Sequence, residues 1–271
     1  MQATTQWIID VMEEWAPQRW AAETDNVGLL IGDGTRPLNR VLTALDLSED
    51  VLREAVQGRF DFVITHHPLI SRYVQPINSI TADNALGKKI MTLIGNGIGL
   101  FCAHTNLDAA PGGVNDLLFD LLGLENKEYL IPPENPDAPT MGLVGVFSKD
   151  ISLYELAQHV GDVLKIEHVR YIGGADRQIR KVGFCSGRGN ALIKAALANK
   201  CDVFVTGDID YHTAMDVSEA GMAMIDATHY ASEVPVAEAI AKRVKKAAEI
   251  AGVKLVVEVS KVDGQVFGVT R

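Results

Sequence analysis

The feature that most constrains the fold of this chain is a regular alternation of short apolar runs with longer amphipathic segments. The run VLTALD (41–46) is typical of a buried strand, and Ser48 with Glu49 and Asp50 predicts a helix to about Gln57, because serine caps helix amides and the helix dipole favours early acids. We expect further strands at 60–65, 98–103, 140–147, 181–185, 202–207, 222–227 and 254–260. We expect further helices at 5–15, 84–97, 112–123, 152–164, 190–199, 210–220 and 235–250. This alternation predicts an α/β fold with largely buried sheets.

Two stretches of the chain are related. Residues 40–67 align without a gap on residues 181–208, and both read as strand, loop, helix and a second strand ending in threonine. Any two strand-helix-strand units share such a pattern, but the ungapped register favours an internal duplication. In the second stretch Gly207 and Asp208 occupy the positions of His66 and His67 in the first, so a strand-helix-strand unit does not itself require these histidines.

Composition sets limits on function. The 271 residues carry a formal net charge of -10 and no Lys/Arg-rich block, which argues against a nucleic-acid-binding scaffold. The N-terminus is acidic and no apolar run reaches about 18 residues, so we expect a cytoplasmic protein without signal peptide or membrane span. Cys102, Cys185 and Cys201 lie in or beside apolar stretches without a CxxC motif, and we expect buried, reduced thiols.

Histidines follow three of the expected strands. FVITHHPLI (62–70) ends a strand with His66 and His67, whereas FCAHTNLD and IDATHYASE place a histidine after a strand and a carboxylate four residues later. Ligands bind outside the carboxyl ends of strands in open α/β sheets, and histidine with carboxylate suits Zn, Fe, Mn, Co or Ni. The residues concerned are His66, His67, His104, Asp108, His229 and Glu233.

Each of these clusters alone is weak, because a single histidine near a strand end is more often a hydrogen-bonded residue than a ligand. Four of the seven histidines fall in the three clusters, however, and together they favour a metal site. We interpret the other three, His159, His168 and His212, as ordinary histidines.

The adjacent histidines also bear on the number of metals. Consecutive side chains of an extended chain point apart, so His66 and His67 would flank two ions, with a carboxylate bridging. Paired metals about 3.5–4 Å apart are a common hydrolytic arrangement.

These motifs resemble one known family. The chain is similar to the GTP cyclohydrolase I type 2 homologs, also called the Nif-three-like proteins, over nearly its whole length. The resemblance rests on TDNVGLLIGD (24–33), ALDLSEDVLREA, VITHHPLI, AHTNLDAAPGGVN, SGRGNALI with VTGDIDYH, and ATHYASEVP. One departure is THYASE, where many relatives have a phenylalanine-aspartate pair after the histidine.

The resemblance implies an architecture. It implies two related, intertwined α/β halves with mixed sheets and a dinuclear metal site in the cleft between them, often assembled as a ring-shaped homohexamer. We expect residues 1–127 plus 225–271 in the first half and 128–224 in the second. The Pro-rich segment YLIPPENPDAPT (129–140) would be a stiff seam where longer relatives carry an inserted domain, making this chain a short form.

The resemblance also implies a ligand set for two divalent metal ions. His66, His67, Asp108, His229 and Glu233 would be the ligands, with Glu233 as the bridge. His104 would be a further ligand or a neighbour of the ligands.

Three weaker signals each leave two interpretations open. The amides of SGRGNALI (186–193) either receive an anion or form a tight turn, since the full GxGxxG spacing is lacking. Asp208 and His212 either contact the metal cleft or are a capping acid and a surface histidine. Asp25 and Asn26 either approach the site or turn the chain.

The leading functional hypothesis is a metal-dependent hydrolase that acts through a metal-bound water on a nucleotide-like, phosphoester or amide substrate. The family name suggests a purine nucleotide, but these residues do not by themselves predict ring opening of GTP. The alternative is a non-catalytic protein that binds or delivers metal or serves as an interaction scaffold.

Overall fold

The chain forms two compact units. The computed structural model describes residues 2–71, 77, 79–135 and 137–268. Unit 1 comprises Met1–Leu107 and Val236–Gly264, and unit 2 comprises Asp108–Pro235 and Gln265–Arg271. The chain therefore leaves unit 1, builds most of unit 2, and returns.

Unit 1 contains a five-stranded mixed sheet. Its order is β13 (Val256–Val259), β4 (Arg40–Ala44), β5 (Phe62–Thr65), β6 (Gly99–Cys102) and β2 (Gly28–Ile31). Neighbouring strands are parallel from β13 to β6, and β2 is antiparallel to β6. A two-stranded sheet joins β1 (Ala3–Thr4) to β3 (Pro37–Leu38).

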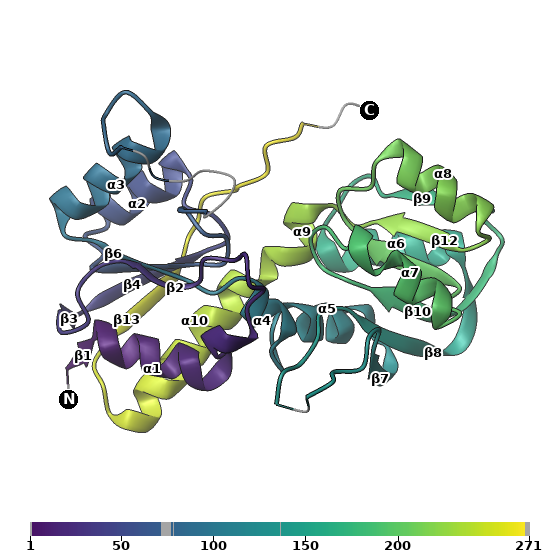
Figure 1. The fold of residues 1–271 in the computed structure, drawn as a ribbon, viewed down its shortest axis with the longest axis horizontal. Coiled ribbons are helices and arrows are strands. Elements are labelled where there is room, and N and C mark those ends of the chain that lie inside the picture. Colours follow the sequence, from purple (N-terminus) through teal and green to yellow (C-terminus); the bar gives the residue numbers. More distant parts are fainter. Residues whose placement is uncertain (1, 72–76, 78, 136, 269–271) are drawn as a thin grey trace. The chain divides into compact units, whose positions relative to one another are not determined.

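Helices cover both faces of this sheet (Figure 1). Leu42 of β4 packs into a core with helices α2 (Glu49–Gln57) and α3 (Ala85–Asn96) on one face. Helices α1 (Thr5–Trp15) and α10 (Pro235–Ala251) lie on the other, where the Thr43 hydroxyl donates to the Ala237 carbonyl of α10 at 2.8 Å. The short helix η1 (Gln18–Trp20) follows α1, and the short helix α4 (Thr105–Ala109) contains the point at which the chain passes from unit 1 to unit 2.

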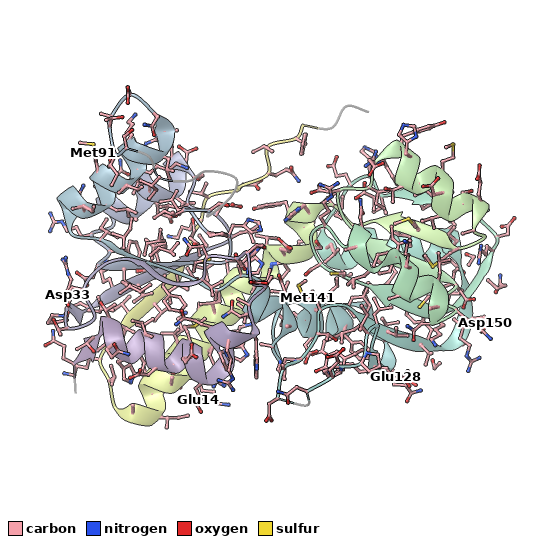
Figure 2. The ribbon with its side chains drawn as sticks, in the orientation of Figure 1. Glu14, Asp33, Met91, Glu128, Met141 and Asp150 are labelled. Atoms are coloured by element: carbon pink, nitrogen blue, oxygen red, sulfur yellow. The ribbon has the colours of Figure 1, made fainter. Side chains whose placement is uncertain are left out.

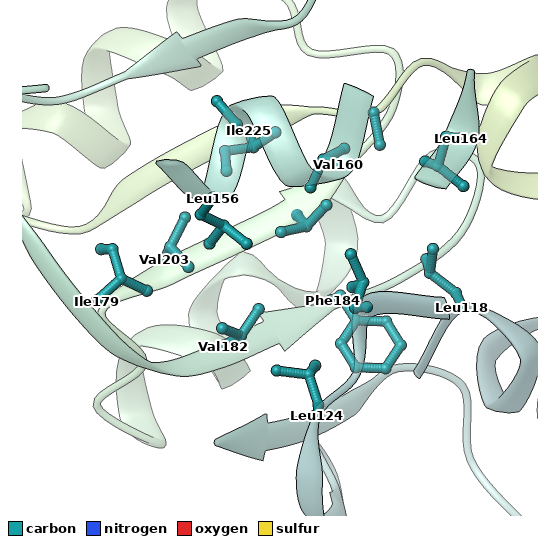
Figure 3. Packing of buried hydrophobic residues seen from close by; sticks show 14 of the residues in the cluster. Leu118, Leu124, Leu156, Val160, Leu164, Ile179, Val182, Phe184, Val203 and Ile225 are labelled. Atoms are coloured by element: carbon teal, nitrogen blue, oxygen red, sulfur yellow. The ribbon is translucent and has the colours of Figure 1, made fainter. Parts of the chain in front are cut away.

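Unit 2 contains a six-stranded mixed sheet. Its order is β7 (Glu125–Tyr129), β8 (Leu143–Ser152), β10 (Gln178–Phe184), β11 (Val203–Thr206), β12 (Ala223–Asp226) and β9 (Arg170–Ile172). The three central strands β10, β11 and β12 are parallel, and the flanking strands are antiparallel. Helices α5 (Val114–Leu122) and α6 (Leu153–Leu164) pack into the core on one face, as Leu118, Val160, Val182 and Ile225 illustrate (Figure 3).

The other face of the unit 2 sheet has its own apolar cluster. Ala196 of α7 (Ile193–Ala198) and Val217 of α8 (Tyr211–Glu219) pack there against Phe204 and Met224. Two short helices, η2 (Asn190–Leu192) and α9 (His229–Glu233), follow strands of this sheet.

The α/β class with mixed sheets, predicted from the sequence, is confirmed. Local signals also act as expected: the Ser48 hydroxyl caps α2 by accepting from the Val51 amide at 3.1 Å, and Gly97 ends α3 in the left-handed conformation. The strands β1, β2, β3, β7 and β9 were not predicted; β7, for example, is exposed along nearly its whole length and contains no apolar run.

A repeated pattern of hydrogen bonds supports the duplication predicted between residues 40–67 and 181–208. In unit 1 the carboxylate of Asp61 accepts hydrogen bonds from both amides of residues 39–40 at 2.7 and 2.9 Å. In unit 2 the carboxylate of Asp202, its aligned partner, accepts from both amides of residues 180–181 at 3.0 and 2.8 Å. An aspartate at the same aligned position therefore links β4 to β5 in unit 1 and β10 to β11 in unit 2.

The division into units differs from the boundaries expected at residues 127 and 225. Helix α5 buries Leu118 and Leu122 in the core of unit 2, and β12 pairs with β11, so both elements belong to that unit. The Pro-rich segment expected to be a seam links β7 to β8, two antiparallel neighbours in one sheet. Pro136 lies outside the described residues.

The negative charge is distributed over the surface. Glu14, Asp33, Glu128 and Asp150 are exposed and come from well-separated parts of the chain (Figure 2). In the part of the chain that the structure describes, no helix combines the length and the apolar character that crossing a membrane requires.

Candidate metal centre

In unit 1 the expected histidines follow the carboxyl ends of parallel strands. All four residues of β5 are buried, and His66 and His67 follow directly after this strand. His66 is 0% exposed. The amide of His67 donates to the Leu45 carbonyl at 2.9 Å, so the neighbouring strand-end loop holds the backbone of the pair.

Both adjacent histidines are held through Nδ1. His66 Nδ1 lies 2.8 Å from the Ala103 carbonyl, and His67 Nδ1 lies 2.8 Å from Asp46 Oδ1. A carbonyl or an ionised carboxylate only accepts, so each Nδ1 carries the proton, and the lone pair of the neutral ring is on Nε2. Metal-binding histidines show this arrangement.

His104 follows β6 and has the same arrangement. Its Nδ1 lies 2.9 Å from Asp25 Oδ2, and the amide of Thr105 donates to the same oxygen at 3.1 Å. Burial alone would raise the pKa of Asp25, but hydrogen bonds from His104, Thr105 and Asn26, with the charge of His104, outweigh it and hold that pKa well below its usual range. Asp25 therefore stays ionised and orients His104.

The three rings lie together. The centroid of the His66 ring is 5.1 Å from those of His67 and His104, and the latter two are 5.5 Å apart. One ring nitrogen from each lies within 4.8 Å of the others. We call His66, His67 and His104 the three-histidine group; its donor set suits a divalent transition metal.

Unit 2 supplies a histidine-carboxylate pair on α9. Asp208 Oδ2 lies 2.8 Å from His229 Nδ1, and Nε2 of the same ring lies 3.1 Å from Glu233 Oε2. Two ligand atoms on one ion, with bonds of about 2.0–2.2 Å, are separated by about 3 Å. The pair therefore fits a metal with little movement, and Glu233 is only 4% exposed.

The start of α9 is strained. Thr228, which caps the helix by accepting from the Ala231 amide at 3.3 Å, has φ 56° and ψ 152°, a region that β-branched residues avoid. Asp226 Oδ1 accepts from the Thr228 amide at 3.0 Å, and Arg170 holds Asp226 from β9. Such strain is typical of functional sites, and here it precedes His229.

Asp108 is buried in unit 2 at 8% exposure. Its carbonyl accepts from Asn115 Nδ2 at 3.0 Å, which fixes the backbone at this position. Burial raises the pKa of the Cys185 thiol, and the negative charges of Asp108 and Glu233 raise it further. Both carboxylates therefore lie near the same buried thiol.

The weaker signals are now interpretable. Asp208 orients His229, whereas Asp210 caps α8 by accepting from the Thr213 amide at 3.0 Å, and His212 is exposed. Asp25 approaches the candidate site rather than only turning the chain.

The glycine-rich loop after β10 is a tight turn whose amides bind protein acceptors. The Gly187 amide donates to Ser232 Oγ at 2.9 Å and the Gly189 amide to Thr206 Oγ1 at 2.8 Å. Neither amide is therefore offered to an anion.

Sequence reasoning missed Asp46. The local pattern places Asp46 only at the end of a strand, and no local pattern indicates a contact between two residues that are 21 positions apart. His159 and His168 lie outside both ligand groups: His159 Nε2 contacts the Leu122 carbonyl at 3.1 Å, and His168 is exposed. The assignment of individual ligands stays a prediction.

Comparisons with known proteins agree with these features. A family model described as Duf34/NIF3 (NGG1p interacting factor 3) matches residues 3–265. A GTP cyclohydrolase 1 type 2 homolog of Clostridium perfringens is 35% identical over 240 residues, covering 88% of this chain and 90% of the relative. A crystal structure of a Bacillus cereus protein related to NIF3 superposes with a TM-score of 0.91 at 26% identity, covering 100% of both chains. The chain therefore belongs to the Duf34/NIF3 family.

Proposed function

We propose that this protein binds two divalent metal ions and is a metal-dependent hydrolase that acts through a metal-bound water on a nucleotide-like, phosphoester or amide substrate. The proposed ligands are the three-histidine group of unit 1 together with Asp108, His229 and Glu233 of unit 2. One observation carries the proposal: His66, His67, His104 and His229 each have Nδ1 held by a carbonyl or carboxylate at 2.8–2.9 Å.

The residues of the chain prepare the site before any ligand arrives. Asp25, Asp46 and Asp208 fix the tautomer and the orientation of the ring that each contacts. Burial of Glu233 favours its use as a ligand, because a buried carboxylate needs a compensating positive charge. Divalent ions bound there would lower the pKa of a coordinated water and polarise a phosphoryl or carbonyl oxygen.

The first test is the metal content of the purified protein after incubation with Zn, Mn or Fe, measured by elemental mass spectrometry. We expect about two equivalents per chain, as in dinuclear sites. The double variant H66A/H67A should lose most of that metal, whereas H168A, which replaces an exposed histidine outside the ligand groups, should keep it. Negligible metal in the parent protein, or equal loss in both variants, would contradict the proposal.

The second test separates a hydrolase from a metal-binding protein without chemistry. p-Nitrophenyl phosphate, nucleotides and simple amides would be incubated with metal-loaded protein, and products followed by absorbance and chromatography. We expect the metal-loaded parent protein to hydrolyse at least one of these substrates. The Glu233→Gln variant, and the parent protein with added chelator, should show no hydrolysis. A loaded protein that turns over none of these substrates would leave metal binding as the function.

Metal delivery is the second candidate function, and the exposure of two proposed ligands favours it. The side chains of His67 and His229 are 21% and 37% exposed, so solvent and chelators can reach them. A carrier should pass its metal to a chromogenic chelator within the mixing time and show no turnover. Slow release from a protein that hydrolyses substrate would reject this alternative.

A further inference from the structure

The loop of residues 186–190 (SGRGN) lies directly against the histidine-carboxylate pair of unit 2. Gly187 has φ +57°, and a Cβ built on it would lie 2.1 Å from Glu233 Oε1 and 3.2 Å from His229 Nε2. Only a glycine brings the backbone this close to both ligand atoms.

The side chain of Arg188 is the exposed part of this loop. Ser186, Gly187 and Gly189 are buried, whereas Arg188 is exposed. Hydrogen bonds from Thr213 lower the pKa of Asp210, and the positive charge of Arg188 contributes to that effect. Arg188 therefore follows directly on the glycine that contacts the ligand pair, and its guanidinium lies near enough to the carboxylate of Asp210, at the start of α8, to act on it.

Two polar atoms of the same loop are buried without a protein partner. Among the residues that the structure describes, Ser186 Oγ and Asn190 Oδ1 accept or donate no hydrogen bond. Ser186 is only 5% exposed. Buried polar atoms are nearly always paired. The Ser186 hydroxyl can donate to an acceptor such as an anion, whereas Asn190 Oδ1 only accepts and needs a donor such as water.

We propose that the 186–190 loop binds an anionic group of the substrate, a phosphate, and that Arg188 is the residue that recognises it. A guanidinium offers planar, paired donors that match phosphate oxygens, and it keeps its charge at any physiological pH. The loop amides cannot take this role because Ser232 and Thr206 occupy those of Gly187 and Gly189. This inference rests on the proposed function, because it names the chemistry of the substrate for that same site.

The test measures phosphate binding and metal content on the same metal-loaded samples. Inorganic phosphate and phenyl phosphate would be titrated into the parent protein, R188A, R188K and R180A by isothermal calorimetry. Arg180 is a matched control: it lies near the start of β10 rather than after its end, and it is exposed and paired with Asp150 at 3.4 Å. Elemental mass spectrometry would report the bound metal in each sample.

We expect R188A to keep its metal and to bind both phosphates at least about tenfold more weakly, because hydrogen bonds to a charged group are lost. R188K, which keeps the charge without the paired donors, should lose less, and R180A should bind like the parent.

Unchanged phosphate binding in R188A would overturn the proposal, as would the absence of phosphate binding by the loaded parent. Loss of metal in R188A would also overturn it, because Arg188 would then support the ligands rather than contact the substrate. The metal content of the parent is read independently, so each of these failures is distinct from a failure of the proposed function.

Discussion

At the scale of single residues, the candidate centre depends on glycine as much as on histidine. Gly187 combines a left-handed backbone with contact to Glu233, so a methyl group there meets the carboxylate at 2.1 Å. Gly123 also has a left-handed backbone, at φ +67°, but nothing lies within 4 Å of its Cβ position.

This contrast defines a paired experiment. Gly187→Ala and Gly123→Ala should both lose about 1 kcal/mol from the strained backbone. We expect only Gly187→Ala to lose metal as well, because Glu233 must move. Metal content and urea unfolding of both variants would be compared. Full metal occupancy in Gly187→Ala would show that the carboxylate has room to move without leaving the ligand set.

Asp25 gives a prediction for pH. Its pKa in the folded protein lies below the ordinary value of 3.8, so its contribution to stability is present above that pH and is lost as the pH falls towards the folded-state pKa. In metal-free protein, we expect the difference in unfolding free energy between the parent and Asp25→Asn to shrink as the pH falls from about 4 to about 2. Urea unfolding at each pH measures this difference, and a difference that is constant over this range would contradict it.

The residues that orient the histidines show where sequence reasoning reaches its limit. The strand-end positions of His66, His67, His104 and His229 were predictable from local pattern. The groups that hold their Nδ1 atoms were predictable only in part: Asp25 and Asp208 were candidates with two interpretations, and Asp46 was not named. The contact between Asp25 and His104, for example, spans 79 residues and is made only by the tertiary fold.

At the scale of elements, local signals fixed the central strands and most helices. Buried strands such as β5 and β11 are continuous apolar runs that periodicity detects. The edge strand β7 carries no such run: it has the sequence ENKEY and is held by pairing with β8. Its place depends on the neighbouring strand, which a local pattern does not contain.

The related elements of the two units predict matched energetics. Arg59 and Lys200, two residues before Asp61 and Asp202, have nearly equal φ angles of 52° and 55°. Asp61→Ala and Asp202→Ala each remove two hydrogen bonds to a carboxylate, so each should destabilise the unit that contains it by about 1–3 kcal/mol.

Urea unfolding of these two variants would be compared with that of Asp162→Ala, which replaces an exposed acid on α6 and should change stability by less than about 0.5 kcal/mol. If only one of the two variants is destabilised, the repeated hydrogen bonds do not have the repeated role that the duplication implies.

At the scale of the whole molecule, the three cysteines report on the two units separately. Cys102 is buried in unit 1, whereas Cys185 and Cys201 are buried in unit 2. Burial raises the pKa of Cys201 to about 11, with Asp202 adding to the effect and Lys181 opposing it. All three thiols should therefore resist iodoacetamide at about pH 8 in the folded protein.

Labelling in increasing urea, followed by peptide mass spectrometry, tests whether the units unfold independently. We expect Cys185 and Cys201 to become reactive together and Cys102 to follow its own transition, because each unit has its own apolar core. A single transition for all three thiols would show that the units unfold as one.

The interrupted course of the chain through unit 1 has a consequence for biosynthesis. Every strand of the unit 2 sheet has been synthesised once Asp226 is added to the chain, but the unit 1 sheet still lacks β13, and its face still lacks α10. The sheet of unit 1 is thus begun first and completed last. During that interval the nascent chain exposes the apolar side of β4, β5 and β6 while unit 2 can already fold, which is the stage of synthesis at which a chaperone has most to protect.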